Sequence, residues 1–222
     1  MSNHISINTI AQIAGGRVEN DAAVEISGIS LDSRAVGSGA IFAALPGTRT
    51  HGAMFAHDSA ASAFLTDEEG WALLQDAGEI RPVIVVESVR PILGRVASAV
   101  YGNPSSKLTV LGVTGTSGKT TTTYMLEAGL TAADKKVGLI GTTGTRIMGE
   151  DVPTSLTTPE APKLQELFAE MVTRGVTHVV MEVSSHALDL GRVGGTQFTA
   201  AGFTNLSQDH LDFHPTMEDY FE

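Results

Sequence analysis

The residues whose types and spacing are most specific for chemistry form the segment 114–121, TGTSGKTT. Its glycines let backbone N–H groups approach phosphate oxygens without a Cβ in the way, and a following helix N-terminus adds partial positive charge. In such a loop Lys119 reaches the β- and γ-phosphates of a nucleotide, and the Thr120 hydroxyl is a ligand for Mg²⁺. Val113 stands where the G-x-x-x-x-G-K-S/T motif has its first glycine, and a glycine-rich turn with a surface lysine is the alternative interpretation.

Glu182 is the first candidate outside this loop. It lies in an apolar run, residues 178–183, where an unpaired charge is costly to bury. If that run is a strand of an open parallel sheet, its carboxyl end lies where such sheets bind ligands. Glu182 is therefore predicted to be a second Mg²⁺ ligand, with a structural ion pair as the alternative.

His210 and His214 follow a later apolar run at residues 198–203. Their spacing occurs in zinc-binding helices, but Pro215 and the polar residues before it favour a loop. Next to a nucleotide site, His210 is predicted to contact metal or phosphate, whereas His214 is predicted to be structural.

The elements that must position these residues alternate between strands and helices. After a break at residues 102–106, apolar runs predict buried strands at 108–113, 137–140, 178–183 and 198–203. One helix is expected over about 119–132, and a second is expected to begin at Thr158 as N-cap, with Pro159 and Glu160 in its first turn. The apolar residues of the second helix share one face: Leu164, Leu167, Phe168, Met171 and Val172. This alternation predicts a mostly parallel sheet that is covered on both faces.

Shorter elements are predicted before the break. Apolar runs predict strands at 24–31, 41–45, 64–65 and 83–86, and helices at 52–63, with Phe55 on one face, and 89–101. We take the break as the boundary between a small α/β N-terminal domain, residues 1–103, and a P-loop domain, residues 104–222. The predicted fold class is therefore α/β.

Composition limits the class of protein. The 222 residues carry 14 basic and 25 acidic side chains, a net charge of −11, and no cysteine. These values exclude a disulfide scaffold and thiolate metal sites, and they argue against nucleic-acid binding. No apolar run is long enough to span a membrane and residues 1–10 do not resemble a secretory signal, so we expect a soluble, cytoplasmic protein. The length corresponds to about one and a half domains.

Several motifs together resemble the Mur ligases, which share the segment GVTGTSGKTTT at 112–122 with the folylpolyglutamate synthases. A more specific resemblance, to the MurE branch of that family, covers essentially the whole chain. It is carried by residues 31–34, 45–52, 157–160, 181–188, 192–193 and 204–214, in that order.

The resemblance implies an ATP-dependent acid–amino-acid ligase of peptidoglycan synthesis. Members of this branch add meso-diaminopimelate or L-lysine to UDP-N-acetylmuramoyl-L-alanyl-D-glutamate in the cytoplasm, and they are usually monomers. ATP phosphorylates the D-glutamate γ-carboxylate, and the incoming amine then displaces phosphate from the acyl phosphate. The general resemblance favours diaminopimelate, and it implies neither a nucleic-acid nor a membrane partner.

The resemblance also implies roles for residues at matching positions. The implied ATP-binding residues are Gly115, Thr116, Ser117, Gly118, Lys119, Thr120 and Thr121. Catalytic roles are implied for Lys119, Glu182 and His210, and metal contacts for Thr120, Glu182 and His210. Contacts to the UDP-muramoyl dipeptide are implied for Leu31, Ser33, Arg49, Thr50, His51, Thr157, Thr158, Ser184 and Arg192. Leu156 and Leu190 stand where some relatives have asparagine and glutamine, so those two contacts are not expected.

Two other interpretations stay open. One is another ATP-dependent amide ligase, such as a MurF relative or a folylpolyglutamate synthase. The segment 32–34 disfavours the synthase. The other is a non-catalytic nucleotide-binding module.

Residues 216–222 begin a helix with Thr216 as a cap. The resemblance implies that this helix leads to a carbamylated lysine that binds Mg²⁺ and to an amino-acid-binding domain. We therefore expect this chain alone not to complete the ligation.

Overall fold

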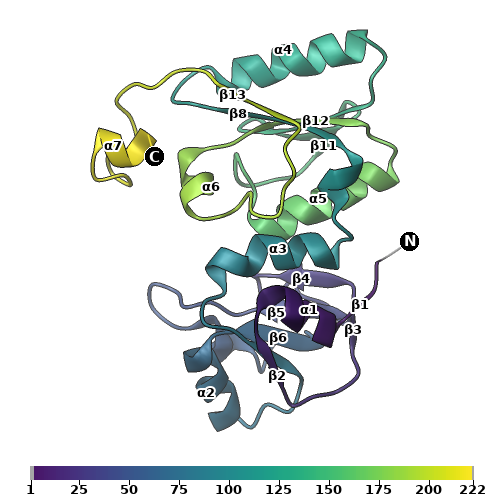
Figure 1. Ribbon diagram of the computed structural model, residues 1–222, viewed down its shortest axis with the longest axis vertical. Coiled ribbons are helices and arrows are strands. Elements are labelled where there is room, and N and C mark those ends of the chain that lie inside the picture. The colour runs from purple at the N-terminus through teal and green to yellow at the C-terminus, as the bar shows by residue number, and fades with distance from the viewer. Residues whose placement is uncertain (1–2, 222) are drawn as a thin grey trace. The chain divides into compact units, whose positions relative to one another are not determined.

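The computed structural model describes residues 3–221, and the chain divides into two compact units (Figure 1). The first unit comprises Met1–Asn103 with Ala161–Glu166, and the second comprises Pro104–Glu160 with Leu167–Glu222. Each contains a mostly parallel sheet with helices, so the predicted α/β class is confirmed. Within residues 3–221, no helix combines the length and the apolar character that a membrane crossing requires.

The first unit is built on a five-stranded sheet. Its strands, in spatial order, are β2 (Arg17–Glu19), β7 (Val83–Val85), β6 (Ala63–Thr66), β5 (Ala40–Ala43) and β4 (Gly28–Ser30). The strands β4 to β7 are parallel and β2 is an antiparallel edge. A separate pair consists of β1 (Ile5–Ser6) and β3 (Glu25–Ile26). The predicted strand 24–31 is thus divided into β3 and β4, because Ser27 turns to bond Gly39 O through its backbone N–H, at 2.8 Å.

Helices cover this sheet with two apolar clusters. Residues of α1 (Ile7–Ala14) and α3 (Arg90–Val100) contribute to one cluster, and α2 (Glu68–Asp76) and the 3-10 helix η1 (Gly52–Phe55) contribute to the other. The predicted helix 52–63 is wrong beyond η1. The carbonyls of Ala56, Ser59 and Ala61 turn toward the Arg81 guanidinium, which donates to them at 2.7–3.0 Å, so they are not in a helical ladder.

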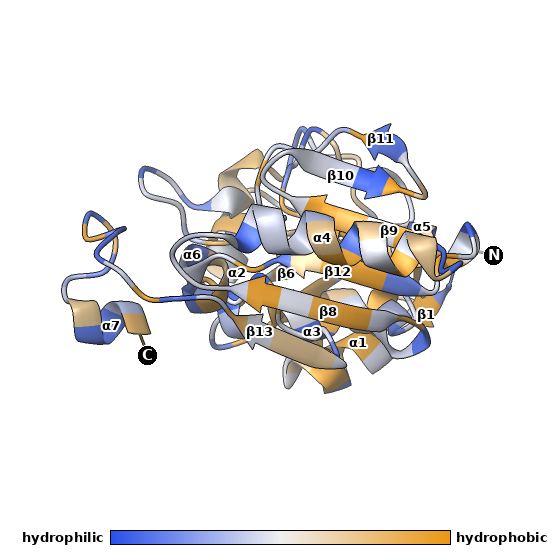
Figure 2. Cartoon of the chain, turned by 90° about the horizontal axis from the view of Figure 1, so that it is seen from above, coloured by the Kyte–Doolittle hydropathy of each residue, from blue (hydrophilic) through white to orange (hydrophobic). Residues whose placement is uncertain are grey.

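The second unit contains a six-stranded sheet. Its strands, in spatial order, are β11 (Glu150–Val152), β10 (Gly144–Ile147), β9 (Val137–Gly141), β12 (His178–Glu182), β8 (Thr109–Thr114) and β13 (Ala200–Phe203). The last four are parallel, and β10 and β11 add antiparallel strands at one edge. Figure 2 shows apolar residues along β8, β9 and β12, as expected for strands buried on both faces.

Helices α4 (Lys119–Ala132) and α5 (Ala161–Thr173) lie on opposite faces of this sheet (Figure 1). The predicted start of α4 is confirmed, but the predicted N-cap of α5 is wrong. The helix begins at Ala161, because the Thr158 hydroxyl instead donates to Glu182 O at 2.9 Å and accepts from Ser184 N at 3.1 Å. Two short helices, α6 (Ser185–Asp189) and α7 (Met217–Phe221), follow.

Candidate functional site

The carboxyl ends of the central strands bring the phosphate loop, Glu182 and the segment after β13 to the same edge of the sheet. Val113 of β8 is in register with Glu182 of β12, and Thr114 is in register with Phe203 of β13. This convergence was expected from the strand pattern, because parallel strands present their carboxyl ends together.

The phosphate loop is closed against the segment that follows β13. Gly115 has φ 123°, and a Cβ at this position would lie 2.2 Å from Thr204 Oγ1, so only glycine fits here. Thr116 N–H donates to Asn205 O at 2.9 Å and Ser117 N–H donates to Asn205 Oδ1 at 3.2 Å. The loop is therefore held by partners from a distant part of the sequence.

Lys119 lies at the first position of α4. Its ammonium group donates to Gly115 O at 2.6 Å and to Thr116 O at 3.0 Å, so the side chain folds back over the loop. Gly118 precedes the helix in the left-handed conformation, and no side chain caps it. A helix N-terminus without a side-chain cap beside a lysine is a suitable site for a phosphate group.

Glu182 is only 1% exposed, and its carboxylate is held by threonines. Thr120 Oγ1 donates to Oε2 at 3.0 Å, Thr142 N–H donates to Oε1 at 2.9 Å, and Thr142 Oγ1 donates to Oε2 at 3.1 Å. A Cβ on Gly141 would lie 2.3 Å from Oε1, so this glycine makes room for the carboxylate. Among residues 3–221 no lysine, arginine or histidine pairs with Glu182, which does not support the alternative of a structural ion pair.

The oxygen atoms of Thr120 and Glu182 are suitable ligands for a hard cation. A hydroxyl and a carboxylate from Thr120 and Glu182 are ligands that Mg²⁺ uses in nucleotide sites. The described part of the chain contains no cluster of three or more histidine, aspartate or glutamate side chains arranged for a metal. The structure thus brings together Thr120 and Glu182, while the His210 ring contacts the rings of His186 and Tyr220.

His210 belongs to a cluster of imidazole and aromatic rings. Its ring centroid lies 5.0 Å from that of His186 and 5.9 Å from that of Tyr220, and the buried His214 ring lies 5.8 Å from His186. Burial, followed by the neighbouring His210 and His214, lowers the pKa of His186 below its usual value. His186 was not predicted as a site residue, although it directly follows the Ser184–Ser185 pair.

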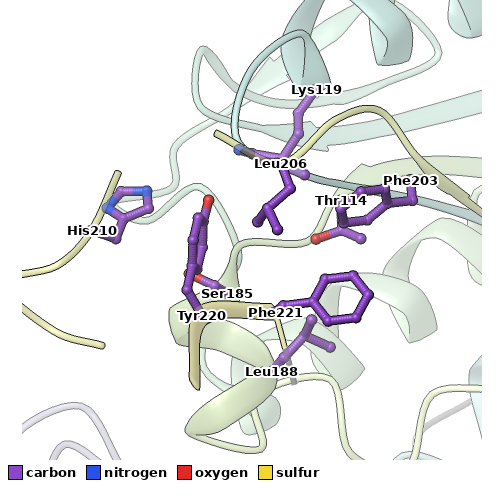
Figure 3. Close-up of a pocket in the computed structure, with 10 residues that line it drawn as sticks. Thr114, Lys119, Ser185, Leu188, Phe203, Leu206, His210, Tyr220 and Phe221 are labelled. Carbon is purple, nitrogen blue, oxygen red and sulfur yellow. Dashed lines mark hydrogen bonds between the residues drawn. The ribbon is translucent and has the colours of Figure 1, made fainter. Parts of the chain in front are cut away.

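A cavity of about 150 Å³ lies beside Lys119 (Figure 3). Leu188, Phe203, Leu206 and Phe221 form apolar parts of its lining, and its polar lining includes Lys119, Ser185 and His210. The Ser185 hydroxyl is buried and has no hydrogen-bond partner among the described residues. Sequence reasoning missed this hydroxyl because a second serine in a Ser-Ser pair carries no signal of its own.

The predicted dipeptide contacts of the second unit occupy different environments. Thr157 Oγ1 lies 3.1 Å from Thr142 Oγ1 and so joins the threonines around Glu182. Thr158 is buried, and the Ser184 hydroxyl caps α6 by accepting from Ala187 N–H at 3.2 Å. Arg192 Nε lies 2.8 Å from Glu160 Oε1, so its charge is partly neutralised.

The predicted contacts of the first unit lie on loops that leave one edge of its sheet. Leu31 and Ser33 follow β4, and Arg49 and Thr50 lie in the exposed loop after β5; these strands are parallel neighbours. His51 is different, because its ring is buried. Ala53 N–H donates to Nδ1 at 3.0 Å and Nε2 lies 3.1 Å from Asp67 Oδ1, so both ring nitrogens already have partners within the chain.

Comparisons with known proteins agree with this architecture. Residues 25–101 match the family model "Mur ligase family, catalytic domain", and residues 113–222 match "Mur ligase middle domain". The chain is 67% identical over 201 residues to the UDP-N-acetylmuramoyl-L-alanyl-D-glutamate--2,6-diaminopimelate ligase of Corynebacterium glutamicum, which covers 89% of this chain and 39% of that protein. The chain thus spans about two fifths of the length of this relative.

Solved structures give the same result. A structure of a UDP-N-acetylmuramoyl-L-alanyl-D-glutamate--2,6-diaminopimelate ligase matches 98% of this chain and 43% of its own, with a TM-score of 0.80 and 30% identity. A MurF ligase from Thermotoga maritima, solved in complex with ADP, matches 87% of this chain and 41% of its own, with a TM-score of 0.57 and 25% identity.

Proposed function

The chain belongs to the Mur ligase family, and from this premise we propose that it supplies the UDP-substrate and phosphate-loop parts of a 2,6-diaminopimelate-adding ligase. The acceptor of the amino acid would be UDP-N-acetylmuramoyl-L-alanyl-D-glutamate, and the reaction a cytoplasmic step of peptidoglycan synthesis. The names of the relatives favour diaminopimelate over lysine. The observation that carries the proposal is the buried Glu182, which accepts a hydrogen bond from Thr120 beside the lysine of a phosphate loop and pairs with no basic side chain among residues 3–221.

The phosphate loop is proposed to bind ATP. The α4 N-terminus and Lys119 provide positive charge for the β- and γ-phosphates, and residues 115–121 provide backbone N–H groups. Thr120 and Glu182 are proposed to hold Mg²⁺, which would neutralise phosphate charge when bound. His210, which lines the same cavity as Lys119, remains a proposed phosphate or metal contact.

The N-terminal residues, 1–103, are proposed to bind the UDP part of the substrate. Leu31, Ser33, Arg49 and Thr50 lie on neighbouring loops at one sheet edge, which supports a shared ligand. In the second unit, Thr157 and Arg192 are proposed to contact the muramoyl dipeptide. A guanidinium suits this role because it can donate two parallel hydrogen bonds to one carboxylate or phosphate group.

In the proposed reaction a D-glutamate carboxylate oxygen attacks the γ-phosphorus of ATP, and the bond to ADP breaks. The amine of diaminopimelate then attacks the acyl carbon, phosphate leaves with the bonding electrons, and the amine loses a proton. The contribution of this chain is electrostatic, because Lys119 and the loop N–H groups offset negative charge that builds on the transferred phosphoryl group.

Binding experiments test this proposal. We expect the 222-residue chain to be stabilised against heat by ATP with Mg²⁺ and by UDP-N-acetylmuramoyl-L-alanyl-D-glutamate. Dihydropteroate, which tests the alternative of a folylpolyglutamate synthase, should not stabilise it. Arg49→Ala should weaken the UDP-dipeptide affinity measured by calorimetry. Arg17→Ala is the control, because Arg17 lies on the edge strand β2, and β7 and β6 separate that strand from β5, which Arg49 follows. If neither the UDP-dipeptide nor ATP bound, the proposal would be wrong.

A further inference from the structure

Thr142 is a residue that neither the motifs nor the proposed function assigns. It follows β9, on the turn that leads into β10, and it makes two of the three hydrogen bonds that hold the Glu182 carboxylate. Its backbone N–H holds Oε1 and its hydroxyl holds Oε2, so one residue engages both oxygens.

The direction of each hydrogen bond in this group is fixed by the carboxylate. An ionised carboxylate only accepts, so the protons of the Thr120 and Thr142 hydroxyls both point to Glu182. The lone pairs of Thr142 Oγ1 are then free to accept, and Thr157 Oγ1 donates to them at 3.1 Å. In the same way, the lone pairs of Thr120 Oγ1 are left free for a cation.

The turn that carries Thr142 is itself fixed. The neighbouring Thr143 hydroxyl bonds the Tyr124 hydroxyl on α4, and the Arg146 guanidinium lies 4.5 Å above the Tyr124 ring while it pairs with Glu127. A threonine also has few side-chain rotamers, because it is branched at Cβ. The hydroxyl of Thr142 is therefore presented to Glu182 from a rigid support.

We propose that Thr142 is a positioning residue, which orients the Glu182 carboxylate so that its oxygens and the Thr120 hydroxyl together receive the Mg²⁺ of the nucleotide. This assignment rests on the proposed function. In this role Thr142 acts through Glu182, to which both its N–H and its hydroxyl donate. Residues that orient metal ligands in this way typically change metal affinity by about 10–100-fold when they are replaced.

The test compares ATP affinity of the 222-residue chain in Mg²⁺ with its affinity in EDTA, measured by calorimetry. Thr142→Val should reduce the Mg²⁺-dependent gain in affinity by about tenfold or more and leave the affinity in EDTA unchanged. Thr142→Ser, which restores the hydroxyl, should behave as the unaltered chain. Thr143→Val is the matched control, since it removes the neighbouring hydroxyl that bonds Tyr124 instead of Glu182.

Two further variants separate positioning from folding. Thr142→Ala leaves space for water and carries the test if Thr142→Val does not fold. In a Glu182→Gln background, Thr142→Val should cause no further loss of the Mg²⁺ effect.

The outcomes separate the two proposals. A Mg²⁺ effect that survives both Thr142→Val and Thr142→Ala overturns the positioning role alone, as does an equal loss of affinity in Mg²⁺ and in EDTA. ATP binding without any Mg²⁺ effect in the unaltered chain overturns the proposed metal site, and the role of Thr142 with it.

Discussion

His51 in the first unit and Glu182 in the second are both buried polar residues, but they are satisfied in different ways. The His51 ring uses one nitrogen to accept from Ala53 N–H and the other to pair with Asp67, so both of its nitrogens have partners. The Glu182 carboxylate is surrounded by hydroxyl and amide donors, and no basic side chain pairs with it in the described part of the chain. Burial alone therefore does not mark a binding site; a buried charge that the fold leaves without a counter-ion does.

A glycine lies against each of these side chains, Gly70 against His51 and Gly141 against Glu182. A Cβ on Gly70 would lie 2.5 Å from His51 Cε1 and 1.9 Å from Thr66 Oγ1, and a Cβ on Gly141 would lie 2.3 Å from Glu182 Oε1. In both places the fold uses a glycine to admit a polar side chain, but only the second side chain faces the proposed ligand.

Replacement of the lysine in the phosphate loop should give the largest effect. ATP at about 100 times its Kd should stabilise the chain by about 2.7 kcal/mol, and we expect Lys119→Ala to abolish this stabilisation because the phosphate charge loses its partner. Thermal unfolding with and without ATP and Mg²⁺ measures it. Lys135→Ala, an exposed lysine after the end of α4, is the control and should keep the shift. An unchanged shift in Lys119→Ala would count against the phosphate-loop assignment.

Asp67→Ala should destabilise the chain without changing nucleotide binding. Asp67 Oδ1 accepts from Gly70 N–H at 2.9 Å as the N-cap of α2, and it also pairs with His51 Nε2. Loss of the cap costs about 1 kcal/mol and the unpaired buried imidazole about 1–3 kcal/mol more. Denaturant unfolding should report this loss. A change in ATP affinity of the folded variant would contradict the division between the two regions.

Alanine at the two glycines should separate stability from binding. Gly70→Ala should lower the free energy of unfolding by about 1–3 kcal/mol, because the new Cβ meets the packed Thr66 and His51 side chains. Gly141→Ala should displace the Glu182 carboxylate and so weaken ATP binding in Mg²⁺ more than in EDTA. Unfolding curves and calorimetry on both variants test the pair. If Gly70→Ala and Gly141→Ala weakened Mg²⁺-dependent ATP binding equally, the contrast between His51 and Glu182 would be wrong.

The last prediction is a pH dependence of the first unit, which has no effect at neutral pH and appears only in alkali. Burial, followed by the charge of Glu166, raises the pKa of Tyr101 to about 12 from 10.0. A raised pKa means that the folded state binds the proton more tightly, so stability is complete below pH 10 and falls as the pH rises toward 12. Ultraviolet titration should show one tyrosine ionising late, and Tyr101→Phe should remove both the late step and the alkaline loss of stability.

The strand-and-loop framework of the second unit could be predicted because its signals are local. The apolar run before Thr114, the glycines and Lys119 together defined a strand, a loop and a helix start, and the structure agrees. The same local logic failed at Thr158. Its hydroxyl could cap a helix, but it bonds Glu182 O and Ser184 N instead. Both partners lie at the end of β12, distant in the sequence, so no local pattern predicts them.

The roles of individual side chains depended on contacts that no local pattern contains. The motif implies a ligand contact for His51, and only its spatial neighbours Asp67 and Ala53 show that both ring nitrogens are already bonded. Thr142 carries no motif at all, yet it makes two of the bonds to Glu182. Helices α1 and α2 escaped prediction, although Ser6 and Asp67 are ordinary cap residues in front of them.

The bonds between Asn205 and the phosphate loop make binding there an exchange of partners. The N–H groups of Thr116 and Ser117 already donate to Asn205, so an anion that takes both donors must first displace it. The net enthalpy of anion binding at the loop is then the difference between the new hydrogen bonds and the ones to Asn205 that they replace.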